Sequence, residues 1–121
     1  MKDDRVYLTH IIQGLQRLIS YTESMSLEYF LSDVKTQDAC IRQLEVIGEA
    51  TKRISISLRD RFPKIAWRGM AGMRDRLIHE YMDIDLSIVW STATNDAMPT
   101  LIDLEEIYVQ LQDEASSETT N

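Results

Sequence analysis

Apolar side chains recur at spacings of three and four residues through most of this chain, and this periodicity constrains its fold more than any other feature. Such spacing gathers the apolar residues on one face of an α-helix, whereas a half-buried strand would need strict alternation. The 121 residues include only 4 glycines and 2 prolines, so few positions can end a helix or form a tight turn. A chain of this length supports one core. The sequence therefore predicts a single all-α domain.

The expected helices form an antiparallel bundle of four to five members. They are predicted over residues 4–21, 36–58, 66–81 and from 86 towards the C-terminus, with one or two short helical turns near 26–32. We assign residues 1–112 to the helical domain. Residues 113–121 are acidic and have no apolar anchor, so we expect them to form a flexible tail.

Local signals place several details within this bundle. Asp3 and Asp4, Ser26 and Asp85 stand where the first turns of helices need a side-chain oxygen as a cap. In the short segment we expect Leu27, Phe30 and Leu31 to point inward. Gly48 lies mid-helix, which predicts the close approach of another backbone. Pro99 lies inside the last helical pattern, which predicts a kink or a split near 95–98.

The small number of cysteine and histidine residues and the hydropathy of the chain limit the compartment and the cofactors to be expected. Cys40 is the single cysteine, so a reducing cytoplasm is the simplest location, and we expect this thiol to be a small core residue. With only His10 and His79 besides, the usual zinc cluster is not expected, nor is any cofactor. His10 is expected to be half-buried and structural. No apolar run approaches the ~20 residues of a membrane span, and the first ten residues lack a signal-peptide core.

Charge is distributed unevenly along the chain. The net charge of −7 argues against nonspecific binding to nucleic acid. Residues 51–79, however, hold eight basic and two acidic residues, a net charge of +6, which leaves −13 for the rest. Such a basic segment either forms solvated helix surfaces or binds phosphate, and the second interpretation requires its side chains to converge.

The basic segment closes with RDRLIHEY, residues 74–81, here called the motif segment. On a helix, Asp75 and His79 are four apart and therefore adjacent, so the carboxylate can orient the imidazole. Arg74 and Tyr81, seven apart, also share a face. Arg74 and His79 are five apart, about 140° around the axis, so one straight helix does not bring them together. Two copies meeting at this helix would do so, which predicts a homodimer.

These residue types suit metal-free cleavage of RNA. A histidine near neutral pKa can take the proton of a ribose 2′-hydroxyl or protonate the leaving oxygen. Arginine offers a planar fork to the phosphate, and tyrosine can stack on a base. Each residue also has a structural interpretation, because His79 can cap the helix and Arg74 can pair with Asp75 or Glu80. Trp67 and Trp90, which flank the segment, are expected to pack within the bundle.

A wider stretch, WRGMAGMRDRLIHEYMDIDLSIVW over residues 67–90, resembles the signature of the HepT-like family of HEPN-domain proteins. These are toxin halves of toxin–antitoxin pairs. The resemblance extends in order to QDACIRQLEVIGEATKRIS at 37–55, to the FPKIAW connector and to YTESMSLEYFL, and so covers nearly the whole chain. Two departures stand out: Asp75 occupies a position that is often Asn, and Ala66 stands where a proline often precedes the tryptophan.

The resemblance implies a fold, an activity and partners. It implies a HEPN-like homodimer that cleaves RNA without a metal, with Arg74 and His79 catalytic and Asp75 supporting. It also implies a cognate antitoxin of the minimal nucleotidyltransferase (MntA) type, which adds AMP to Tyr81. Arg68 and Arg76 are our candidates for further RNA contacts.

Three functions of different classes stay open at this point. The first is the RNA-cleaving toxin. The second is a non-catalytic helical module that binds the nucleotidyltransferase and offers Tyr81 as its acceptor. The third is a structural helical dimer in which the motif segment only ends a helix.

Overall fold

The structure is a computed structural model that describes residues 3–77 and 84–119, without the side chains of Arg74 and Thr119. The described residues are almost entirely helical and contain no strand, which confirms the all-α prediction. The elements are α1 (Asp4–Thr22), α2 (Leu27–Ser32), α3 (Val34–Lys52), α4 (Ile56–Arg61), α5 (Trp67–Ala71), α6 (Met73–Leu77), α7 (Leu86–Ser91), the π-helix η1 (Thr92–Asp96) and α8 (Ala97–Thr119).

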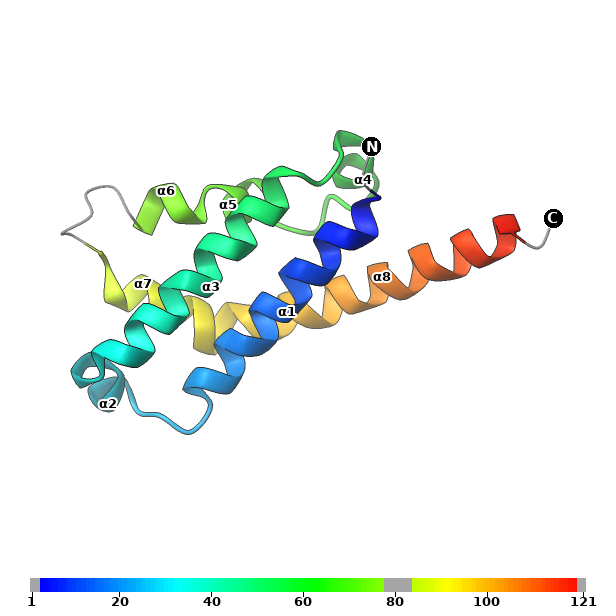
Figure 1. Cartoon of the computed structure of the whole chain (residues 1–121). Helices are drawn as coiled ribbons and strands as arrows, with labels where there is room; N and C mark the ends of the chain where they lie inside the picture. Colours follow the sequence, from blue (N-terminus) through cyan, green and yellow to red (C-terminus); the bar gives the residue numbers. More distant parts are fainter. Residues whose placement is uncertain (1–2, 78–83, 120–121) are drawn as a thin grey trace.

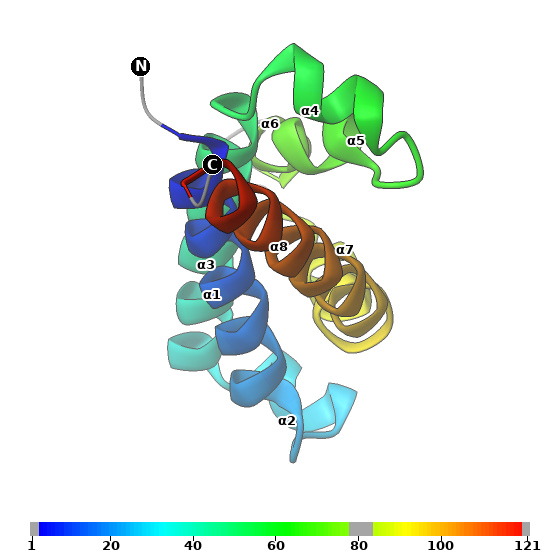
Figure 2. The same ribbon diagram turned by 90° about the vertical axis from the view of Figure 1, so that its right-hand side faces the viewer.

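Three long helices, α1, α3 and α8, build the body of the molecule. Figure 1 shows α1 and α3 running side by side in opposite directions, with α8 packed against α1. The short helices α5 and α6 lie along α3, and α7 with η1 leads into α8 on another side (Figure 2). One continuous core joins them, and its fully buried members include Leu8, Phe30, Leu44, Leu77 and Leu104.

Local capping follows the sequence closely. The carboxylate of Asp3 accepts a hydrogen bond from the amide of Arg5, and the hydroxyl of Ser26 accepts one from Tyr29. Asp85 accepts bonds from the amides of Ser87 and Ile88. The hydroxyl of Ser87 donates a further bond to Asp85, and together these hold the pKa of that carboxyl below its ordinary value. Capping at Asp3, Ser26 and Asp85 is thus confirmed.

The prediction of one continuous helix over 36–58 is wrong, because the structure divides this range into α3 and α4. Ser55 lies between them in an extended conformation and caps α4 by accepting from the amide of Leu58 at 3.1 Å. Asp4 fixes this break from another helix: its carboxylate accepts from the amide of Ser55 at 2.9 Å and from its hydroxyl at 2.6 Å. A contact across 51 residues of sequence therefore decides where α3 ends.

Two further helices depart from prediction. The helix expected over 66–81 is divided at Gly72 into α5 and α6, and its residues 78–81 lie outside the described part. Pro99 produces neither a split nor a separate helix. Instead, the chain passes through η1, where the amide of Ala97 bonds to the carbonyl of Thr92 five residues earlier. This wider turn just before a proline keeps the helix continuous, since proline supplies no amide to a normal turn.

The structure also corrects an expectation about which residues of α2 are buried. Phe30 is fully buried as predicted, but Leu27 and Leu31 are 43% and 50% exposed, because α2 is short and packs through one face. The C-terminal segment continues α8 as helix to Thr119, and the flexibility expected of it from residue 113 stays a prediction. Arg61 anchors this part by donating two hydrogen bonds to the carboxylate of Glu114, one of them at 2.9 Å.

A glycine sets the closest approach between helices. A Cβ atom on Gly14 of α1 would lie 2.6 Å from Cγ1 of Ile47 on α3. Gly48 is buried on α3, and the close approach expected there stays a prediction.

Candidate functional site

The motif segment is only partly described. Arg74 and Asp75 lie on α6, where Asp75 and Arg76 are exposed and Leu77 is fully buried in the core. His79 and Tyr81 lie outside the described residues. The convergence of Arg74, Asp75, His79 and Tyr81 therefore stays a prediction, whereas the anchoring of the helix that begins the segment is an observation.

Both flanks of the motif segment are fixed in the bundle through tryptophans. Trp67 is 5% exposed, and its indole Nε1 donates to the carbonyl of Phe62 at 2.9 Å. On the other flank, the ring of Trp90 packs on that of Phe30 with centroids 5.2 Å apart. This confirms the prediction that both tryptophans pack within the protein.

The basic segment does not converge as a whole. Four of its side chains are held by other parts of the chain: Arg53 by Glu49, Arg59 by the carbonyl of Thr51, Arg61 by Glu114 and Lys64 by Asp103. These pairs lie mainly along the α3–α4 turn and α8. The alternative interpretation, in which the entire segment forms one phosphate-binding surface, is therefore not supported.

Of the three remaining described basic side chains of the segment, Lys52 ends α3 and the other two are arginines of α5 and α6. Within the described part of the chain, Arg68 on α5 and Arg76 on α6 make no hydrogen bond or ion pair, and both are exposed. They come from the two short helices that lead into the motif segment. These are the two arginines predicted as RNA contacts, and their lack of a described partner leaves them available to a phosphate.

A cavity of about 370 Å³ lies beside α6, and we call it the motif-side groove. Its floor comes from Leu15, Leu44 and Ile47 on α1 and α3. One wall is formed by α5 and α6, and the other by η1 and the start of α8. Figure 2 shows α5 and α6 above the start of α8, with both to the right of α1 and α3. The groove is mostly apolar.

Two polar groups of the motif-side groove, Asn95 and Asp96 on η1, were not found from the sequence. They stand on the wall opposite Arg76, which the sequence suggested as an RNA contact. The sequence signal was Pro99, which predicted an irregular helix near 95–98 but not which neighbour it would face. Only the packing of η1 against α1 and α8 makes these residues part of a cavity.

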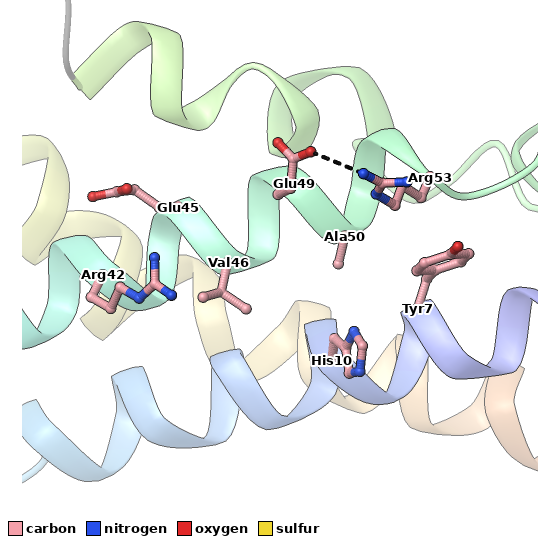
Figure 3. A pocket seen from close by; sticks show the side chains of 8 residues that line it. All are labelled: Tyr7, His10, Arg42, Glu45, Val46, Glu49, Ala50 and Arg53. Atoms are coloured by element: carbon pink, nitrogen blue, oxygen red, sulfur yellow. Dashed lines mark ion pairs between the residues drawn. The ribbon is translucent and has the colours of Figure 1, made fainter.

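A second, larger groove of about 660 Å³ lies between α1 and α3. Figure 3 shows Tyr7 and His10 rising from α1 towards the charged face of α3, which carries two arginines and two glutamates (Arg42, Arg53, Glu45 and Glu49). His10 is exposed rather than half-buried as expected, and its ring meets Tyr7 edge-on at 6.4 Å. The described lining includes nothing from residues 61–77, so the motif-side groove is the better candidate site.

Other predicted features concern the thiol, metals and membranes. Cys40 is fully buried, and burial raises the pKa of its thiol to about 11, which confirms the prediction of a core residue. Across residues 3–77 and 84–119, no group of three or more His, Cys, Asp or Glu side chains is arranged to hold a metal ion. None of the described helices has the length and apolarity to span a membrane.

Comparison with known proteins gives a consistent result. The family model described as ribonuclease HepT-like matches residues 11–112. A putative RNase of Methanocaldococcus jannaschii is 39% identical over 113 residues, which cover 93% of this chain and 93% of that protein. A probable ribonuclease HepT of Thermococcus cleftensis is 43% identical over 95 residues, which cover 78% of this chain and 86% of that protein. No solved structure matches the chain.

Proposed function

Because the chain belongs to the ribonuclease HepT-like family, we propose that it is a HEPN endoribonuclease and the toxin of a toxin–antitoxin pair. The observation that carries this proposal is the family match over residues 11–112, a range that includes the whole motif segment. Relatives named as RNases that match over most of their own length support the same activity.

In the proposed reaction, His79 acts as the general acid–base group. It accepts the proton of a ribose 2′-hydroxyl, and the 2′-oxygen then attacks the neighbouring phosphorus. A new bond forms between phosphorus and the 2′-oxygen, and the bond to the 5′-oxygen of the next nucleotide breaks as that oxygen takes a proton from water. The products are a 2′,3′-cyclic phosphate and a 5′-hydroxyl. No metal is needed for this proton transfer.

Arg74 is proposed to stabilise the charge that develops on the phosphate oxygens, since a guanidinium can donate two parallel hydrogen bonds to them. Asp75 would orient the imidazole of His79. Arg68 and Arg76 would hold neighbouring phosphates, and their exposure without a described partner supports this role.

We further propose that two copies form the complete site. On one straight helix Arg74 and His79 would point about 140° apart, so a groove shared by the helices of two copies would bring them together. The exposed large apolar residues of the described part lie elsewhere, on α1, the α2–α3 region, α4 and α8, so a contact through α5 and α6 would be polar. It would then be sensitive to salt.

Tyr81 is the proposed control point. A nucleotidyltransferase antitoxin of the MntA type would add AMP to its phenol in the cytoplasm. Each AMP adds a phosphodiester charge of about −1 and a nucleoside beside the arginines, which would block the groove and neutralise its charge.

The decisive experiment compares wild-type protein with His79→Ala during inducible expression without the partner, following growth and RNA integrity. Purified proteins are then assayed on RNA with and without EDTA. We expect His79→Ala to cleave ~10²–10⁴-fold more slowly, the usual range for a general acid–base group. His10→Ala is the matched control, because His10 is the other histidine and is exposed in the α1–α3 groove. Cleavage that requires a divalent metal, or that survives His79→Ala, would refute the mechanism.

A second candidate, the non-catalytic module that binds the nucleotidyltransferase, is favoured by one observation. Asp75 is exposed and negatively charged at the point where a phosphate would bind. That module would show AMP on Tyr81 and no difference in RNA integrity between wild type and His79→Ala.

A further inference from the structure

We infer that the motif-side groove is a specificity subsite that receives one nucleoside of a single-stranded RNA and selects bases that carry an amino group. This inference rests on the proposed ribonuclease function, which it deepens by naming what the enzyme reads in its substrate. The size of the groove, a glycine in its wall and the polar groups at its rim support this inference.

Size and lining fit a single base. The cavity of about 370 Å³ lies within the range of small-molecule sites, ~300–1,000 Å³. Leu15, Leu44 and Ile47 give it an apolar floor, and Met70 and Met73 line one wall. Sequence-specific recognition of RNA commonly takes unstacked bases of single strands into pockets of this kind. Because Met73 and Arg76 flank Arg74 on α6, a strand bound there would also reach the motif segment.

Gly69 indicates that the groove is kept open for an occupant. It lies inside α5, where glycine is less favourable than alanine. Among the described atoms, a Cβ at this position would meet only the Cβ of Ala66, at 3.9 Å, and no described glycine has a positive φ. Neither packing nor backbone conformation therefore requires glycine here. Gly69 lines the groove, and a methyl group would occupy part of its space.

The rim supplies groups that can read a base. Asp96 is exposed on η1, and its ionised carboxylate only accepts hydrogen bonds, which suits the amino groups of adenine, cytosine and guanine. Uracil has no amino group, and its one donor on the pairing edge, N3–H, lies between two carbonyl oxygens that would face that carboxylate. Asn95 can both donate and accept, and its amide nitrogen has only a 3.4 Å contact to the hydroxyl of Ser91.

Charge orients the bound strand. Arg76 lies on the α6 wall and has no partner in the described part of the structure, whereas the carboxylate of Asp96 lies on the η1 wall. The phosphate therefore lies towards α6 and the base edge towards η1. The larger α1–α3 groove offers no such division, because its two glutamates lie between its two arginines and Arg53 is already paired with Glu49.

Gly69→Ala tests whether the groove needs free space at residue 69, and Asp96→Asn tests whether its carboxylate selects the base. The substrates are short RNA oligonucleotides that differ only in one base around the cleaved bond. We expect Gly69→Ala to raise KM about tenfold, the lower end of what one methyl-sized misfit costs a pocket, with kcat little changed. The melting temperature should rise at the same time, because alanine favours the helix. Loss of activity with gain of stability cannot come from partial unfolding.

Asp96→Asn should reduce the discrimination against uracil, because an amide can donate to the uracil carbonyls. Asp113→Asn is the matched control: it removes the same charge from an exposed position on α8 outside the groove, and it should leave base preference unchanged. Equal KM values for wild type and Gly69→Ala, or unchanged base preference in Asp96→Asn, would overturn the subsite. So would a change in sedimentation caused by Gly69→Ala, which would make the groove a contact between copies.

Binding separates this inference from the proposed function. Titration of the four nucleoside 5′-monophosphates should shift the amide resonances of α5 and η1 for AMP, CMP and GMP more than for UMP, whether or not RNA is cleaved. A protein that binds in this way but never cleaves RNA would refute the ribonuclease and keep the pocket. A protein that cleaves RNA without base preference and shows no such shifts would refute the subsite and keep the ribonuclease.

Discussion

The Cβ that Gly14 lacks would lie 2.6 Å from Cγ1 of Ile47, so α1 and α3 approach as closely as a glycine allows. Ile47 also forms part of the floor of the motif-side groove. The contact that sets the spacing of the two long helices is therefore shared with the candidate site.

Gly14→Ala should destabilise the protein by about 1–3 kcal/mol, since overpacking a filled core outweighs the better helix propensity of alanine. The free energy of unfolding in urea measures the effect. Gly69→Ala is the matched comparison and should shift the midpoint in the opposite direction. Identical midpoints for wild type and Gly14→Ala would show that Ile47 moves aside without cost.

The shared site makes a prediction for mixed dimers. Arg74→Ala and His79→Ala proteins should each be inactive, and a mixture refolded or co-expressed together should regain activity. If each site takes Arg74 from one protomer and His79 from the other, half of the dimers are mixed and carry one intact site in two, about a quarter of wild-type activity. An RNA cleavage assay on the mixture measures it. No recovery from verified mixed dimers would place both residues of a site in one protomer, and sedimentation as a monomer would exclude the dimer altogether.

Tyr81→Phe should escape neutralisation by the nucleotidyltransferase while retaining at least part of its toxicity, because it keeps the ring and removes the acceptor oxygen. Mass spectrometry of wild-type protein co-expressed with the partner should show added mass in units of AMP on the peptide that contains Tyr81. Tyr29→Phe is the control, since Tyr29 is 58% exposed and lies on α2. AMP found consistently on another residue, or modified protein that cleaves at full rate, would contradict the switch.

Glu114→Gln should loosen the last turns of α8 in a way that depends on pH. The hydrogen bonds from Arg61 hold the pKa of Glu114 below its ordinary value of 4.5, so its ionised form favours the folded state. That contribution is fully present above 4.5 and disappears as pH falls through the lowered pKa. Hydrogen exchange of amides 113–119 should be faster in the variant at pH 7, and the difference should vanish in acid. Equal exchange at pH 7 would mean that Arg61 does not anchor this segment.

What the sequence predicts well here depends on neighbours along the chain. The caps at Asp3, Ser26 and Asp85 follow from residues two or three positions away, and the burial of Phe30 follows from helical period. The end of α3 depends on Asp4, which no local pattern contains. The polar rim of the groove depends on which helices η1 packs against.

The candidate site shows the same difference between what local sequence patterns predict and what long-range contacts decide. Arg74, His79 and Tyr81 were assigned through resemblance to a family, because their spacing alone also fits a helix end. The sequence shows the charge of residues 51–79 as one feature. Tertiary contacts divide its arginines into those with a structural partner, such as Arg61, and those without a partner among the described residues, such as Arg76. Sequence gives the charge of a segment but not the partner of each charge.

The ion pairs that join the connector before α5 to α8 have a consequence for synthesis. Arg61 and Lys64 are bound by Glu114 and Asp103, which are synthesised after the motif segment. A nascent chain that has exposed the motif segment therefore still lacks these two carboxylates of α8. During translation, α4 and the connector to α5 gain these ion pairs only once α8 has emerged.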